Sequence, residues 1–232
     1  MPRPVIAALY VAFVLLFALV LRWRHGAPWR QFFIGAAVAF VYVTVVSLIL
    51  TFIVGFGSAL FTPNAPAFLR SDEPLLILLP VLFGPTGEEV LRCYFLWHNR
   101  QMPVWHAAMF GVGFGGYEVL NKAGGTLLAA PHYSATLWAT LSVAMGFVFH
   151  IALTAIVNRA YAQGARFAAV LTVAACYHTG LDFALVLLAI NFAPAGDLAA
   201  TIFWAAMTPV HLAVAWRLYR QGDRAPVPSL LC

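Results

Sequence analysis

Seven ionisable side chains stand inside stretches of this sequence that are otherwise apolar. They are Glu88, Glu89, Arg92, Glu118, His150, His178 and Asp182. An ionisable side chain near the centre of a bilayer costs at least about 2.5–3.5 kcal/mol on insertion scales, so these residues are expected to face the interior of a helix bundle. Carboxylate and imidazole groups together can activate a water molecule, stabilise an oxyanion or bind zinc. These residues are therefore the candidate functional residues of the chain.

The spacing of these residues predicts how their side chains pair. Glu88 and Glu89 stand four and three residues before Arg92, so all three can lie on one broad face of a helix. Arg92 is expected to act as the counter-ion that keeps the glutamate pair ionised. His178 and Asp182 are also four residues apart, so the carboxylate is expected to orient the imidazole.

A glycine-rich stretch, "FGVGFGGYE", leads to Glu118. Its glycines at positions 111, 113, 115 and 116 predict that another helix backbone packs very close to this segment. Five other histidines stand near the ends of apolar runs and are expected at the membrane interface: His25, His98, His106, His132 and His211. The chain has no HExxH and no GxSxG motif, so it lacks the local signatures of zincins and of serine hydrolases.

The elements that must position these groups are membrane helices. The chain has 232 residues, of which 63% are hydrophobic and 9% charged, whereas a soluble domain carries about 25% charged residues. Its mean hydropathy is +0.88. Apolar runs of about 20 residues, the length that crosses a ~30 Å hydrocarbon core, lie at about 4–22, 31–55, 75–97, 105–127, 133–157, 167–192 and 198–217. The sequence predicts an all-α, polytopic transmembrane helix bundle of about seven spans. It forms a single domain over residues 1–232, with the motif-bearing core at about 75–192.

The basic residues predict the orientation of this bundle. Nine arginines fall in segments 22–30, 98–104 and 158–166 and in the C-terminal tail, whereas the opposite side carries only Arg3, Arg70 and Lys122. Since cytoplasmic loops are rich in arginine and lysine, we expect the N-terminus outside and the C-terminus in the cytoplasm. The net charge of +5 then reflects these loops, and no nucleic-acid partner is expected. The expected location is the bacterial inner (cytoplasmic) membrane, where the lipid bilayer is itself a partner.

Four motifs in chain order, "EEVLR", "FGVGFGGYE", "GFVFH" and "HTGLD", resemble the PrsW-like and YhfC-like branches of the CAAX-protease (CPBP) superfamily of intramembrane proteases. The resemblance covers about residues 84–185. It implies an intramembrane endopeptidase fold with a membrane-protein or lipidated-protein substrate. The same superfamily includes a non-catalytic scaffold subunit, so the resemblance alone does not imply activity.

The resemblance also implies roles for single residues. Glu88 and Glu89 match the glutamate pair, one of which is expected to activate the attacking water. Arg92 matches the basic residue that follows the pair, with two intervening residues where the CAAX pattern has three, which favours the PrsW-like branch. Glu118 stands where the CAAX branch has a histidine, and Phe114 stands where YhfC-like chains often have one.

The later motifs contribute His150, His178 and Asp182. We expect Glu118 and His150 to hold the water or a zinc ion. His178, oriented by Asp182, is expected to stabilise the oxyanion or to complete the metal site. Metal dependence stays open at this point: if zinc binds, Glu88, His150 and His178 would be its ligands, with one position left for water.

Two other functions fit the same residues. Intramembrane carboxylates and imidazoles also suit a proton- or ion-coupled transporter, and the fold suits a non-catalytic membrane scaffold. A hydrolase needs its groups around one reacting atom, whereas a relay arranges them along a path. The geometry of the seven residues therefore separates these hypotheses.

Overall fold

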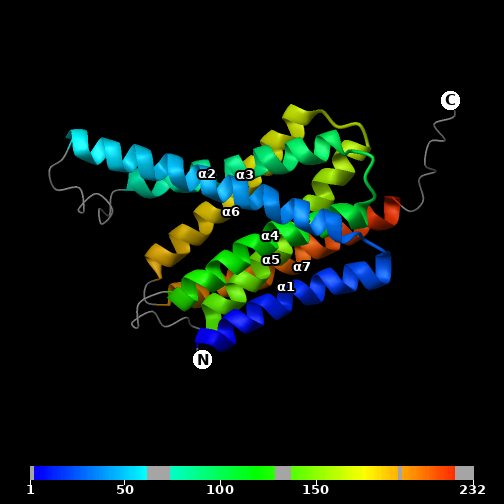
Figure 1. Ribbon diagram of the computed structural model, residues 1–232, viewed down its shortest axis with the longest axis horizontal. Helices are drawn as coiled ribbons and strands as arrows, with labels where there is room; N and C mark the ends of the chain where they lie inside the picture. Colours follow the sequence, from blue (N-terminus) through cyan, green and yellow to red (C-terminus); the bar gives the residue numbers. More distant parts are fainter. Residues whose placement is uncertain (1–2, 62–73, 129–136, 193–194, 223–232) are drawn as a thin grey trace.

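The computed structural model describes residues 3–61, 74–128, 137–192 and 195–222, which form seven helices and no strand (Figure 1). The helices are α1 (Arg3–His25), α2 (Trp29–Phe61), α3 (Pro74–His98), α4 (Val104–Leu128), α5 (Leu137–Ala162), α6 (Phe167–Asn191) and α7 (Gly196–Gly222). Each helix coincides with one of the seven apolar runs. The predicted all-α fold class is confirmed, and the glycine-rich segment is a continuous helix.

The described residues include helices suited to a bilayer. Four segments are long and apolar enough to cross a membrane: Pro4–His25, Leu141–Ala162, Phe167–Leu188 and Leu198–Arg217. Large apolar side chains such as Leu16, Trp23 and Val173 point outwards and are more than half exposed. Soluble monomers rarely expose contiguous apolar surface of this kind. These features indicate a membrane-embedded protein.

The helices form two sets (Figure 1). In one set α4 packs between α1 and α5, and α7 packs on α5. In the other set α3 packs chiefly against α6, and this pair contacts the first set through α5 and α7. α2 lies across the bundle, where it packs chiefly against α4 and also contacts α3. The candidate functional residues come from both sets, so their geometry depends on how the two sets dock.

Glycines bring α2 and α4 into direct backbone contact. A Cβ atom at Gly113 would overlap the carbonyl oxygen of Phe32, and one at Gly35 would overlap the carbonyl oxygen of Phe110. Two further glycines of α4 face α5 rather than α2, since a Cβ atom at Gly115 would lie 2.8 Å from Cβ of His150. The close backbone approach predicted from the glycine run is therefore confirmed. Its counterpart in α2, Gly35, was not predicted, because a single glycine in an apolar run carries little signal.

We expect the substitution Gly113→Ala to destabilise the fold, because the new methyl group must push α2 away from α4. Overpacking of this kind costs about 1–3 kcal/mol. The measurement is the midpoint of thermal denaturation of the purified protein in detergent. Gly180→Ala is the matched control, since a Cβ atom at that helical position meets nothing within 4 Å. Equal midpoints for the two variants would contradict the backbone contact.

Candidate active site

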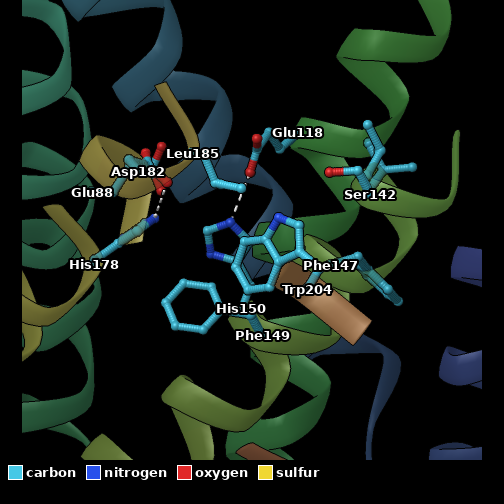
Figure 2. A pocket seen from close by; sticks show the side chains of 13 residues that line it. Glu88, Glu118, Ser142, Phe147, Phe149, His150, His178, Asp182, Leu185 and Trp204 are labelled. Carbon is cyan, nitrogen blue, oxygen red and sulfur yellow. Dashed lines mark ion pairs between the residues drawn. The ribbon is translucent and has the colours of Figure 1, made fainter. Parts of the chain in front are cut away.

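The structure brings all seven candidate residues together from four helices. Figure 2 shows the five of them that line a cavity. α3 carries Glu88, Glu89 and Arg92; α4 carries Glu118; α5 carries His150; α6 carries His178 and Asp182. They are linked by a series of short polar contacts.

Arg92 lies at the centre of the site and is fully buried. Its Nη1 donates to Oε1 of Glu89 at 2.7 Å, and its Nη2 donates to Nδ1 of His150 at 2.6 Å. Nη2 also lies 4.0 Å from Oε2 of Glu88. The guanidinium carbon sits 4.6 Å from the ring centre of Phe114, a favourable cation–π arrangement. Arg92 therefore contacts its own helix as well as α4 and α5.

The contact with Arg92 determines which nitrogen of His150 carries the proton. A guanidinium has donors and no acceptor, so Nδ1 of His150 must accept. The ring proton is then on Nε2, which lies 2.8 Å from Oε2 of Glu118 and donates to it. His150 thus links the buried arginine to the carboxylate of Glu118.

His178 is held chiefly by Glu89. Its Nδ1 lies 2.8 Å from Oε1 of Glu89 and donates to that carboxylate, whereas its Nε2 is 3.9 Å from Oδ1 of Asp182. The i,i+4 spacing correctly predicts that Asp182 lies near the ring. It does not predict the closer partner, because Glu89 stands on the facing helix, and α3 and α6 pack directly together.

The two adjacent glutamates have different surroundings. Glu89 is fully buried, and one of its oxygens serves both Arg92 and His178. The side chain of Glu88 is 18% exposed, and its Oε2 has no hydrogen-bond partner among the described residues. Glu88 borders a cavity of about 160 Å³, whereas Glu89 does not. A small molecule in the cavity can therefore reach the carboxylate of Glu88.

The polar contacts form one continuous series that begins and ends at this cavity. From Glu118 they run through His150, Arg92, Glu89 and His178 to Asp182, and both end members line the cavity. Glu88 lies between the two histidines, because its carboxylate oxygen and a ring nitrogen of each lie within 4.8 Å of one another. In Figure 2 the carboxylates occupy the upper part of the view and point towards one space.

The structure adds Tyr42 of α2 to the residues around the site. This tyrosine is buried, and its hydroxyl donates to the carbonyl oxygen of Gly84, one turn before Glu88. Gly87 leaves room for the ring, since a Cβ atom there would lie 2.6 Å from a ring carbon of Tyr42. Sequence reasoning missed Tyr42 because its partner is 42 residues away; the two nearby glycines were the available signal.

The expectation for His211 is wrong. His211 is buried within α7, which continues five residues past the predicted end of the run, and its Nε2 lies 2.6 Å from the hydroxyl of Tyr177. His25 and His98 stand at the last residue of their helices and His106 stands in the first turn of α4, so their predicted place at helix ends is confirmed. His132 lies outside the described residues.

The three predicted zinc ligands are grouped, but only two of them fit the metal. His178 fits well, since a metal-bound histidine commonly donates its other N–H to a carboxylate, as Nδ1 does to Glu89. Glu88 offers an unengaged oxygen. His150 does not fit: its Nδ1 accepts from Arg92, so Nε2 is protonated and has no lone pair for a cation. A three-ligand zinc site would require His150 to give up both contacts.

We therefore expect the protein purified from zinc-supplemented cells to retain well below one equivalent of zinc, measured by plasma mass spectrometry. His150→Gln should leave that zinc content unchanged, as should the control His98→Gln at the exposed end of α3. One equivalent of zinc that is lost in His150→Gln and kept in His98→Gln would contradict the assigned protonation of His150.

No protein-family model matches the chain, and the searches of curated proteins and of solved structures found no similar protein. The resemblance to the CAAX-protease superfamily consequently rests on the four short motifs, and the function must be argued from the site.

Proposed function

We propose that the protein is an intramembrane peptide hydrolase in which Glu88 activates the attacking water. The observation that carries this proposal is the series of polar contacts that begins and ends at one cavity, where the carboxylate of Glu88 lies with its Oε2 unpartnered among the described residues. The superfamily resemblance supports the same reaction class. Between the two glutamates, Glu88 is the base, because Glu89 is occupied by Arg92 and His178.

The reaction needs a base, an oxyanion donor and a route for the proton. Glu88 takes a proton from water as the water oxygen attacks the peptide carbonyl carbon. The resulting oxyanion accepts a hydrogen bond from Nε2 of His178 in its protonated form, a ring that Glu89 holds in place. Glu88 then passes its proton to the amide nitrogen as the C–N bond breaks, leaving a free carboxylate and an amine. Glu118, oriented by His150, holds the water on the opposite side of the cavity.

The course of the polar contact series favours a hydrolase over a proton or ion relay. A relay must connect two different places, such as the two sides of the membrane. Here both ends of the contact series, Glu118 and Asp182, return to the same cavity. No observation in the described residues specifically favours a scaffold function.

The proposal includes the membrane topology: seven spans, the N-terminus outside and the C-terminus in the cytoplasm of a bacterial inner membrane. It is supported by the match of seven helices to seven apolar runs and by the arginine distribution. Reporter fusions in the 98–104 and 158–166 segments should give cytoplasmic signals. Outward signals at both segments would overturn the orientation.

The hydrolytic proposal predicts that Glu88→Gln lowers peptide cleavage at least about 100-fold, because a general base contributes typically 10²–10⁴-fold. The measurement compares new N-termini of membrane proteins, found by mass spectrometry, in bacteria that express the wild-type chain or the variant. His98→Gln, which lies away from the cavity, is the control and should cut like wild type. Wild-type cleavage by Glu88→Gln, with both proteins present at equal amounts, would refute the role of Glu88.

A further inference from the structure

The cavity at the candidate site has a second, apolar wall. Besides its carboxylates and histidines it is lined by Val143, Phe147, Phe149, Leu185 and Trp204. Figure 2 shows the rings of Phe149 and Trp204 beside His150, below the carboxylate of Glu118. A substrate whose reacting atoms lie among the carboxylates would therefore place the neighbouring atoms against this apolar wall.

Phe149 joins the apolar wall to the reactive groups. Its ring centre lies 5.0 Å from that of His178, 5.4 Å from that of His150 and 5.5 Å from that of Trp204. Consecutive Cα atoms of a peptide are about 3.8 Å apart. A residue next to a peptide bond held by His178 and Glu88 consequently reaches the wall with its own side chain.

The volume of the cavity limits what this side chain can be. A cavity of about 160 Å³ is close in size to apolar protein cavities of about 150 Å³ that hold a single benzene molecule. The same space must also admit the reacting water. A leucine or phenylalanine side chain fits this volume, whereas a prenyl chain, which is several times longer than a benzene ring, does not.

Gly146 of α5 keeps part of this space open. A Cβ atom at Gly146 would lie 3.8 Å from Cζ2 of Trp204, which is ordinary van der Waals contact. Alanine is therefore tolerated at this position without a clash. A longer side chain would extend beside Trp204 into the cavity that both residues line.

Building on the proposed function, we infer that the wall formed by Phe147, Phe149 and Trp204 is a specificity pocket. The pocket accepts one apolar side chain of leucine or phenylalanine size, next to the scissile bond, and it rejects a prenylated cysteine. The substrate class is thus an unmodified membrane-protein segment. A chain that would have to place a lipid group in this cavity is not a substrate.

The cleavage test uses peptides prepared from bacterial membrane proteins, dissolved in detergent and incubated with the purified full-length protein. Cut sites are identified by mass spectrometry, and one frequent site is then synthesised with Leu, Phe, Ala or S-farnesyl-cysteine at the flanking position. We expect kcat/KM for Leu and Phe to exceed that for Ala and for farnesyl-cysteine at least about tenfold, the discrimination typical of apolar pockets. Equal rates for Leu and Ala, or faster cleavage of farnesyl-cysteine, would overturn the inference.

Two pairs of variants locate the preference. Gly146→Leu should lower the Leu/Ala ratio at least about tenfold, whereas Gly180→Leu, at a position where a Cβ atom meets nothing within 4 Å and which does not line the cavity, should leave it unchanged. If Gly146→Leu does not fold, Trp204→Ala should lower the ratio while Trp23→Ala, on the exposed face of α1, does not. A ratio that is the same in all folded variants would place the preference elsewhere and refute the pocket.

Binding separates this inference from the proposed function. Purified Glu88→Gln is titrated with N-acetyl-leucinamide and N-acetyl-alaninamide and followed by ligand-observed NMR. At least about tenfold tighter binding of the leucine compound, lost in the double variant with Gly146→Leu, supports the pocket even if the wild type cuts nothing. Absence of cleavage by the wild type refutes the hydrolase alone, and equal binding of the two amides refutes the pocket alone.

Discussion

The buried guanidinium of Arg92 is the interaction on which the candidate site depends. It neutralises Glu89, determines the protonated nitrogen of His150 and packs on Phe114, so it connects α3 to α4 and α5. Through Glu89 it also fixes His178 on α6. Removing one partner of a buried ion pair generally costs about 3–5 kcal/mol, since the remaining charge is left unpaired. Arg92 therefore holds Glu89 and His150 directly, and it holds His178 and Glu118 through these two residues.

Backbone contact gives this cation a rigid setting. The crossing of α2 and α4 at Gly35 and Gly113 leaves no space for side chains between the two backbones, so the distance between these helices is fixed there. α2 also carries Tyr42, whose hydroxyl bonds the backbone of α3 one turn before Glu88. α2 thus positions both the part of α4 that leads to Glu118 and the turn of α3 before the glutamate pair, although α2 contributes no reactive group itself.

Much of the fold was predictable from sequence, because the apolar runs have the length that a bilayer imposes and each run became one helix. The seven candidate residues were predictable for a related reason, since a charge in an apolar run must face the interior. Their pairing was only partly predictable. The local spacing correctly paired Glu89 with Arg92. It also paired Asp182 with His178, but Glu89 of the facing helix lies closer to that histidine. The contact of Tyr42 and the burial of His211 were missed because contacts between side chains of one helix and another helix leave no periodic signal in the sequence.

The order of the helices along the chain has a consequence for biosynthesis. The partners of Arg92, which are Glu89 and His150, are both present in the chain once α5 has been made. His178 and Asp182 arrive only with α6. A chain made only as far as α5 therefore contains the partners of Arg92 without the groups of α6, and the candidate site can be completed only after α6 has been made.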